Sequence, residues 1–251
     1  ELTEIFRQAE SSLIITNAHR INRGQEPVIP RGKDAEKMDF HFIEREEPEE
    51  AAAAIETLVT DRIPSAFGMD PFLDIQVLSP MHKGGAGVTS LNSRLQQLLN
   101  PSGRELAHGL RKFKPHDKVM QIRNNYEKDV FNGDLGLIFS IDHEAKQLAV
   151  DFDGRIVTYE FPELDELDLA YAISIHKSQG SEYRAVVVPV IMQHYILLQR
   201  NLIYTAATRG KELVVFVGSR DALSTAIKNS KMKRRHTRLA ARLRGETPRR
   251  E

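Results

Sequence analysis

The C-terminal half of the chain alternates short, fully apolar runs with a helical pattern. Residues 169–175, 185–190 and 213–217 are almost wholly apolar, and residues 197–208 between the last two runs have helical spacing. Apolar runs without polar alternation are typical of strands that are buried on both faces of a parallel sheet. A similar run at residues 75–80 has a helical pattern on each side. The sequence therefore predicts an α/β fold with a mostly parallel sheet covered by helices on both faces.

Residues 110–162 have a different character. They contain several short runs of strand-forming residues, with the turn dipeptides Asn132-Gly133 and Asp153-Gly154 beside them. Short strands at regular spacing predict a small β-barrel inserted into the α/β fold. The chain then divides into four parts, which are a first α/β segment at 1–109, the inserted barrel at 110–165, a second α/β segment at 166–227, and a basic tail at 228–251.

Composition excludes several classes of protein. The 251 residues are 28% charged and 41% hydrophobic, as in a soluble globular protein. The chain has no cysteine, which excludes disulfides, thiol catalysis and cysteine-ligated zinc. No apolar stretch is long enough to span a bilayer and no signal peptide pattern is present, so we expect a cytoplasmic protein without a membrane partner. Net charge is zero, but the tail at 228–251 is strongly basic and suits contact with phosphates or a solvated end.

Two polar segments lie beside the apolar runs of the second α/β segment. Residues 174–182 read Ser-Ile-His-Lys-Ser-Gln-Gly-Ser-Glu, and from His176 onwards they follow the predicted strand at 169–175, the position at which open α/β sheets place ligands. Residues 204–209 read Tyr-Thr-Ala-Ala-Thr-Arg at the end of a predicted helix. Arg209 can satisfy the last carbonyls of that helix, or it can stabilise a transferring phosphoryl group from a second domain. His176, taken alone, is a partly exposed loop residue.

These two segments resemble motifs V and VI of superfamily 1 helicases. The resemblance implies that Arg209 is a catalytic arginine on the γ-phosphate. It implies further that three residues contact the nucleotide and that two lie towards single-stranded DNA. The nucleotide residues are Gln179, Gly180 and Glu182, and the DNA residues are Ser174 and His176.

The N-terminal residues resemble motif IV of the same superfamily. The similarity rests on residues 2–8 and 14–22, although Phe6 stands where related helicases commonly have tyrosine. It implies that Arg7 is a second catalytic arginine that reaches the γ-phosphate. Taken without the resemblance, Arg7 is an exposed arginine on a helix.

Residues 117–136 resemble the insertion of RecD-like helicases, a small Src-homology-3-like (SH3-like) barrel that lines the path of single-stranded DNA. Four residues of one loop are the expected DNA contacts, namely Arg123, Asn125, Tyr126 and Lys128. Stacking of a base on an aromatic side chain is worth about 1–3 kcal/mol. In the alternative reading, Tyr126 and Phe131 pack inside the barrel and the polar groups face water.

The resemblance as a whole implies the C-terminal part of a RecD-like superfamily 1 DNA helicase, of the exodeoxyribonuclease V alpha subunit family. The fold would be the second RecA-like motor domain with its inserted barrel. The sequence has no G-x-x-x-x-G-K-[ST] phosphate loop. We therefore expect ATP and Mg²⁺ to bind jointly with a missing N-terminal motor domain, which supplies the magnesium ligands. We expect no ATP hydrolysis from this segment alone.

The expected activity of the whole protein is ATP-dependent 5′-to-3′ DNA unwinding in DNA repair and recombination. Its expected partners are single-stranded DNA, the missing motor domain and the subunits of a helicase–nuclease complex. Two alternatives stay open at this point. The chain can be a non-catalytic DNA-binding module of such a complex, or the helicase part of a conjugative relaxase, which shares motifs V and VI.

Overall fold

The computed structural model describes residues 12–30, 38–230 and 244. Its centre is a five-stranded sheet in which every neighbouring pair of strands is parallel. The strand order is β1 (Phe40–Glu44), β12 (Gly210–Gly218), β11 (Tyr183–Val190), β2 (Ile75–Ser79) and β10 (Ala172–Ser174). The valine-rich runs of β11 and β12 occupy the middle of the sheet and are buried on both faces. This arrangement confirms the predicted α/β class.

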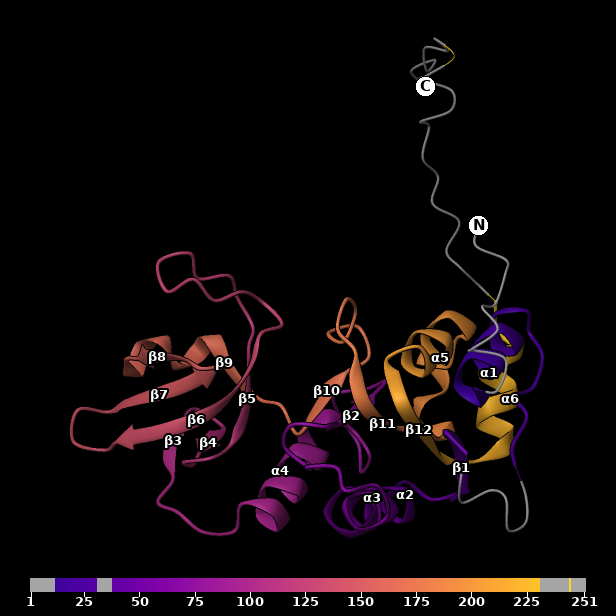
Figure 1. Ribbon diagram of the computed structural model, residues 1–251, viewed down its shortest axis with the longest axis horizontal. Coiled ribbons are helices and arrows are strands. Elements are labelled where there is room, and N and C mark those ends of the chain that lie inside the picture. Colours follow the sequence, from indigo (N-terminus) through magenta and orange to yellow (C-terminus); the bar gives the residue numbers. More distant parts are fainter. Residues whose placement is uncertain (1–11, 31–37, 231–243, 245–251) are drawn as a thin grey trace.

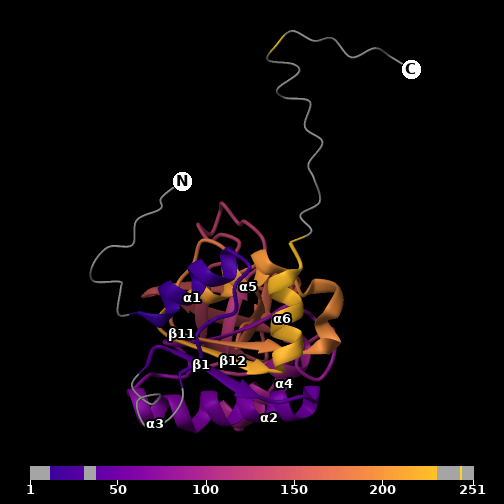
Figure 2. The same cartoon turned by 90° about the vertical axis from the view of Figure 1, so that its right-hand side faces the viewer.

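Helices cover both faces of the parallel sheet, as Figures 1 and 2 show. One face packs against α1 (Leu13–Asn22), α5 (Arg200–Ala207) and α6 (Arg220–Lys228). The other face packs against α2 (Pro48–Thr57), the π-helical turn η3 (Leu58–Arg62), α3 (Ile63–Phe67) and α4 (Val88–Leu99). Each face has its own buried core, and the 3₁₀ turn η5 (Met192–Leu197) connects β11 to α5. Within the described part of the chain, no helix is both long and apolar enough to cross a membrane.

The start of α1 is tied to the start of β1. The Ser12 side chain accepts a hydrogen bond from the Ile15 backbone N–H at 3.3 Å and so caps the helix. Asp39, directly before β1, accepts from the Ser12 hydroxyl at 2.6 Å and from the Leu13 N–H at 2.9 Å. A carboxylate at a helix N-terminus is favourable because it meets the unpaired N–H groups and the positive end of the helix dipole. These bonds hold α1 over one edge of the sheet.

A second unit is inserted between α4 and β10 and lies beside them in Figure 1. It begins with a hairpin of β3 (Leu106–His108) and β4 (Arg111–Phe113). An antiparallel sheet follows, in the order β8 (Arg155–Tyr159), β7 (Gln147–Phe152), β6 (Leu135–Asp142), β5 (Lys118–Gln121) and β9 (Leu167–Leu169). The 3₁₀ turn η4 (Phe161–Glu166) carries the chain from one edge of this sheet to the other. The unit encloses a separate hydrophobic core.

One predicted strand is divided in the structure. The apolar run at 169–175 was expected to be a single strand, but β9 ends at Leu169 in the antiparallel sheet and β10 begins at Ala172 in the parallel sheet. Apolar periodicity cannot show this change of sheet because the residues on both sides of it are apolar. The strands of the insertion run from Leu106 to Leu169. The limits of 110 and 165 that the sequence gives for the inserted domain stay a prediction.

Candidate functional site

The two helicase-like segments meet at the amino-terminal edge of the parallel sheet. Glu182 directly precedes β11 and Arg209 directly precedes β12, whose first residues pair in register. The Tyr183 backbone N–H donates to the Arg209 carbonyl at 2.8 Å. In return, the Arg209 Nη1 donates to the Ser181 carbonyl at 2.9 Å. The segments at 174–182 and 204–209 are therefore held together by hydrogen bonds in both directions.

The guanidinium of Arg209 also lies on the end of α5. Its Nε donates to the Thr205 carbonyl at 3.3 Å and its Nη2 donates to the Thr208 hydroxyl at 3.2 Å. These bonds agree with a helix-capping role. All of its hydrogen-bond partners are neutral, and no carboxylate lies within 4 Å of it in the part of the chain that the structure describes. The positive charge of Arg209 is therefore oriented but not cancelled.

An open cavity of about 450 Å³ lies beside this pair of segments. Its wall comes from α1, the end of α5 and the start of β12, with the lining residues Ser12, Ile14, Ile15, Ala18, His19, Glu182, Tyr204, Thr208, Gly210 and Lys211. At its rim, the Glu182 carboxylate lies 3.4 Å from the Lys211 Nζ, and both side chains are about half exposed. The volume is within the range of small-molecule pockets. Its hydroxyls, its carboxylate and its ammonium group suit the sugar and phosphates of a nucleotide.

The residues from 174 to 182 do not all lie where the sequence placed them. Ser174 ends β10 at the carboxyl edge of the sheet, as expected, but Glu182 leads into the amino edge of β11. The segment crosses back over the face covered by α1, α5 and α6, where Ile175 and Tyr183 pack into the same core. Glu182 is therefore not at the carboxyl edge, where the sequence placed it, whereas Ser174 is at that edge. The binding of a ligand at this edge stays a prediction.

The remaining residues of this segment differ in exposure. His176 and Gln179 are exposed, while Ser174 is buried. Gly180 has a φ of +91° and open space where a side chain would be, so the backbone there can approach a ligand closely. These residues therefore lie in two places. Ser174 and His176 are at the carboxyl end of β10, and Gln179, Gly180 and Glu182 are on the way to the start of β11.

The loop between β5 and β6 presents an aromatic pair. Tyr126 has 78% of its surface exposed and packs edge-on against Phe131, which is 40% exposed, with ring centroids 5.9 Å apart. Arg123 is exposed in the same loop, and no carboxylate lies within 4 Å of it among the described residues. These aromatic rings therefore face solvent rather than packing inside the insertion, which contradicts the alternative reading of the sequence.

Two polar residues of this loop point inwards instead. The Lys128 Nζ lies 2.5 Å from a Glu163 carboxylate oxygen, donates to the Thr158 carbonyl at 2.7 Å and lies 4.8 Å from the centre of the Tyr159 ring. The Asn125 side-chain amide donates to Glu166 at 3.1 Å. Both side chains therefore support the loop from within, whereas Arg123 and Tyr126 point outwards.

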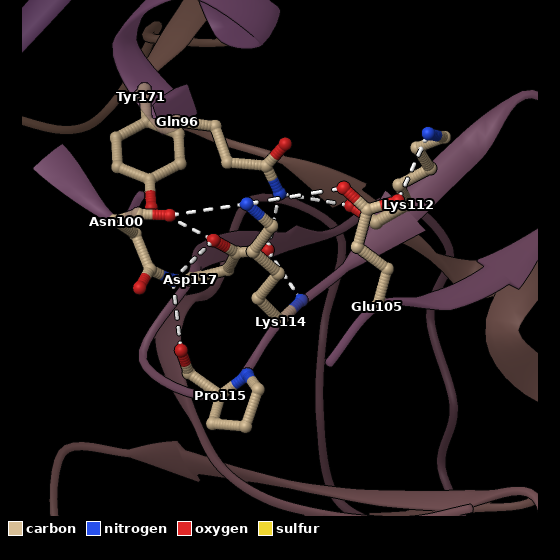
Figure 3. A network of polar contacts seen from close by, with 8 residues as sticks. All are labelled: Gln96, Asn100, Glu105, Lys112, Lys114, Pro115, Asp117 and Tyr171. Carbon is tan, nitrogen blue, oxygen red and sulfur yellow. Dashed lines mark hydrogen bonds and ion pairs between the residues drawn. The ribbon is translucent and has the colours of Figure 1, made fainter. Parts of the chain in front are cut away.

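A buried carboxylate joins the insertion to the α/β unit, and sequence reasoning did not single it out as a functional residue. Figure 3 shows Asp117, directly before β5, at the centre of a polar network. Its side chain is fully buried and accepts four hydrogen bonds. The donors are Gln96 at 2.6 Å, the Lys114 backbone N–H at 2.7 Å, Asn100 at 2.8 Å and the Tyr171 hydroxyl at 2.9 Å. Burial raises the pKa of Asp117, and the four donors oppose that shift.

Lys118, the next residue, is a buried base. Its Nζ donates to the Ile75 carbonyl at 3.1 Å, so a side chain from β5 reaches the first residue of β2. Burial lowers the pKa of Lys118 from 10.5 to about 8, although the nearby carboxylates of Asp70 and Asp74 favour the charged form. The free energy of unfolding therefore depends on the protonation of Lys118.

We predict that Lys118→Met raises the free energy of unfolding at pH 7 by up to about 3 kcal/mol. Below pH 8 Lys118 is protonated in both states, so the folded state carries the full cost of burying the charge. As pH rises from about 8 to 10.5, the folded state loses the proton first and this cost disappears. Urea denaturation of both proteins from pH 7 to 10.5 should show the difference shrinking. Lys112→Met, at an exposed site, is the control, and a difference that is independent of pH would contradict the prediction.

Some residues for which the sequence makes predictions lie outside the described part of the chain. Arg7 is one, and so is most of the basic tail at 228–251. Across residues 12–30, 38–230 and 244, no cluster of three or more histidine, aspartate or glutamate side chains is arranged to hold a metal ion.

The matches to known protein families fall on the two structural units. The family model described as the ATP-dependent RecD-like DNA helicase SH3 domain matches residues 91–152, and the UvrD-like helicase C-terminal domain matches residues 169–217. The ATP-dependent RecD2 DNA helicase of Deinococcus radiodurans is 35% identical over 247 residues, which cover 97% of this chain and 32% of that protein. The chain is therefore related to the RecD-like helicases. Its insertion is the SH3-like domain that the sequence predicted.

Further relatives agree with this assignment. The RecBCD enzyme subunit RecD of Mycolicibacterium smegmatis is 30% identical over 169 residues, covering 67% of this chain and 29% of that subunit. The chain thus spans about a third of the length of these relatives.

Solved structures share the fold. The Pif1 helicase from Bacteroides in complex with ADP-AlF3 and ssDNA has a TM-score of 0.54 at 20% identity, over 92% of this chain and 54% of that one. The Pif1 helicase from Candida albicans has a TM-score of 0.53 at 19% identity, over 92% of this chain and 58% of that one. The chain is therefore a helicase-type C-terminal half, related to RecD and with the fold of Pif1.

Proposed function

We propose that this chain is the C-terminal motor half of an ATP-dependent 5′-to-3′ DNA helicase. In this proposal it binds single-stranded DNA and supplies arginines to an ATP site shared with an N-terminal RecA-like domain. The observation that carries the proposal is the joined edge of β11 and β12. There Glu182 lines an open cavity of about 450 Å³, and Arg209, with no carboxylate within 4 Å among the described residues, lies in the chain between two other lining residues, Thr208 and Gly210.

ATP, bound with Mg²⁺ whose ligands we assign to the N-terminal domain, would supply the free energy for movement along DNA. Arg209 would stabilise negative charge on the phosphoryl oxygens, because its guanidinium is oriented in advance by the Ser181 and Thr205 carbonyls. Glu182 would accept a hydrogen bond from a ribose hydroxyl. Gln179 and Gly180 would line the same side of the nucleotide, and Arg7 would be the second arginine on the phosphate.

Single-stranded DNA would follow the carboxyl end of β10 and the loop between β5 and β6. Ser174 and His176 lie at the first place, and Arg123 and Tyr126 at the second. An exposed arginine can contact a phosphate, and an exposed tyrosine can stack on a base of any sequence. We assign Asn125 and Lys128 to support of this loop, because both already bond residues of the insertion.

ATP hydrolysis tests the shared site. The intact protein should hydrolyse ATP in the presence of Mg²⁺, with stimulation by single-stranded DNA, whereas the 251-residue chain alone should not. Magnesium-dependent turnover by the purified 251-residue chain would refute the assignment of a shared site. Absence of turnover by the intact protein would refute the motor function.

We predict that Tyr126→Ala weakens binding of single-stranded DNA by about 5- to 100-fold, the effect of losing one base–aromatic stack. Fluorescence anisotropy with a labelled oligonucleotide measures the dissociation constant. Arg123→Ala should weaken binding less and lower the dependence of affinity on salt by about one phosphate contact. Ile156→Ala, which also removes an exposed apolar side chain of the insertion, is the matched control. Equal affinity for Tyr126→Ala and the parent would exclude the loop as a DNA contact.

A second candidate is a subunit of a helicase–nuclease complex. The relatives named RecBCD enzyme subunit RecD favour it. Intact protein that hydrolyses ATP when purified alone would favour the independent motor, and activity that appears only with partner subunits would favour the complex.

A further inference from the structure

The most exposed large apolar side chain of the described residues lies at the tip of the hairpin formed by β3 and β4. Leu110 is fully exposed, with a relative accessible surface of 105%, and follows Gly109 in the turn. Gly109 has a φ of +60°, a backbone conformation that favours glycine. The tight turn therefore exposes the Leu110 side chain to solvent. The hydrophobic effect alone disfavours such exposure.

The hairpin itself is firmly held. Phe113 is fully buried and Leu106 is nearly so, and both belong to the core of the insertion. His108 Nε2 lies 3.0 Å from an Asp165 carboxylate oxygen, and Arg111 Nε donates to Asp168 at 2.6 Å. Packing and polar contacts thus fix each strand of the hairpin, and Leu110 lies on a well-supported turn.

Leu110 borders a cavity of about 310 Å³ between the insertion and the α/β unit. Apolar side chains from both units line this cavity, and they include Val88, Met120, Leu169 and Ile173. Polar groups of α4 and β10, among them Thr89, Ser93 and Ser174, line it as well. Such a mixture of apolar surface and a few hydrogen-bonding groups is typical of a small-molecule site.

The cavity has an excess of positive charge. Its lining contains Arg111, Lys112 and Lys177 against one carboxylate, Asp168. Asp168 is shared between Arg111 at 2.6 Å and Lys177 at 3.6 Å. Lys112 pairs with Glu105 at 2.9 Å, but it is 62% exposed, and ion pairs of this kind are weak in water. A ligand that carries negative charge next to an apolar group matches this lining.

We propose that this junction cavity binds one unstacked base of single-stranded DNA, with the Leu110 side chain against the face of the base. The proposal rests on the function proposed above and names a subsite that it does not include. The apolar lining would receive the base, and Lys112 and Lys177 would lie near the adjoining phosphates. Apolar side chains that enter between bases are an established means of unstacking nucleic acids.

The volume agrees with a single base. The cavity, of about 310 Å³, is at the lower end of the range for ligand sites, about 300–1,000 Å³, and is partly open to solvent. It also adjoins one of the DNA surfaces proposed above, because Ser174 lines it. A strand that contacts Ser174 would thus lie next to the cavity.

The test scans a labelled oligothymidylate with one abasic nucleotide placed at each position in turn. With the 251-residue chain, anisotropy should show that the abasic nucleotide weakens binding about 5- to 100-fold at one position more than at its neighbours. Leu110→Ala should weaken binding of the unmodified strand by a similar factor and remove the penalty at that position. Because Leu110 is fully exposed, its loss should leave the fold intact.

Two further variants sharpen the result. Ser93→Trp, on the α4 wall of the cavity, should fill the space and give the same loss without changing Leu110. Phe139→Ala removes another exposed apolar side chain of the insertion, outside the cavity lining, and should retain both the affinity and the positional penalty.

The outcomes separate the two proposals. Normal affinity with a flat abasic scan, or a penalty that survives in Leu110→Ala, would overturn the base subsite and leave the DNA-binding function in place. Absence of binding to any single strand by both the 251-residue chain and the intact protein would overturn the proposed function, and the base subsite with it.

Discussion

Replacing Arg209 by alanine is expected to lower kcat for DNA-stimulated ATP hydrolysis by the intact protein about 10³-fold or more. Arg209 is oriented by three neutral partners, the Ser181 and Thr205 carbonyls and the Thr208 hydroxyl. Its charge is therefore available to a phosphoryl group, and an arginine donated from a second domain contributes on this scale in related chemistry. Steady-state kinetics with saturating single-stranded DNA would measure the change.

The fall should be in kcat rather than in KM, because the charge on the phosphoryl oxygens grows in the transition state. Arg209→Lys should restore little, since an ammonium group lacks the planar fork that fits a phosphate. Arg184→Ala is the control. Arg184 lies near the same sheet edge, but its guanidinium binds Glu212 and Asp74 in exposed ion pairs. A kcat for Arg209→Ala within tenfold of the parent value would leave Arg209 only its capping role on α5.

Asp117→Ala is expected to lower the free energy of unfolding by about 3–5 kcal/mol. The change removes the acceptor of four hydrogen bonds and leaves the Gln96 and Asn100 amides, the Lys114 N–H and the Tyr171 hydroxyl without their partner. Unsatisfied buried donors each cost about 1–3 kcal/mol when the site excludes water. Urea denaturation of the 251-residue chain at pH 7 measures the difference.

Asp117→Asn should have a smaller but clear effect. Each carboxylate oxygen accepts two bonds, so the amide nitrogen of asparagine would face two donors whichever way it turned. Glu127→Ala is the matched control, because that carboxylate is exposed on the loop between β5 and β6. Stability of Asp117→Ala within 1 kcal/mol of the parent would show that water replaces the carboxylate and that the network is not buried as described.

Much of the fold could be predicted from local patterns. The valine-rich runs of β11 and β12 are apolar on both faces, which is why they indicated a parallel sheet before any contact was known. The turn dipeptides beside β6 and β7 likewise indicated the antiparallel insertion. The family resemblance agreed with these patterns, and the RecD-like SH3 and UvrD-like C-terminal matches confirm it.

The sequence predicted which residues belong to the candidate site, but it predicted their positions in the fold only in part. Arg209 and Glu182 were expected to share one site, and the structure brings their segments together through the Ser181 carbonyl. Lys128 was expected to face DNA, but its charge is paired with Glu163 of the same insertion. A sequence pattern shows that a lysine is present. It cannot show that a carboxylate 35 residues away lies within reach of it.

By itself, the sequence determined most of the elements and the chemical groups that they carry, because strand and helix formation depend on neighbours two to four residues apart. Only the tertiary structure decided that Glu182 lies at the amino edge of the sheet, that Asp117 is buried and that Leu110 borders a cavity. These outcomes depend on contacts between distant residues, such as the hydrogen bond from Tyr171 to Asp117 across 54 positions. The free energy of such contacts comes from burial and from paired polar groups, and both exist only after the two units have packed together.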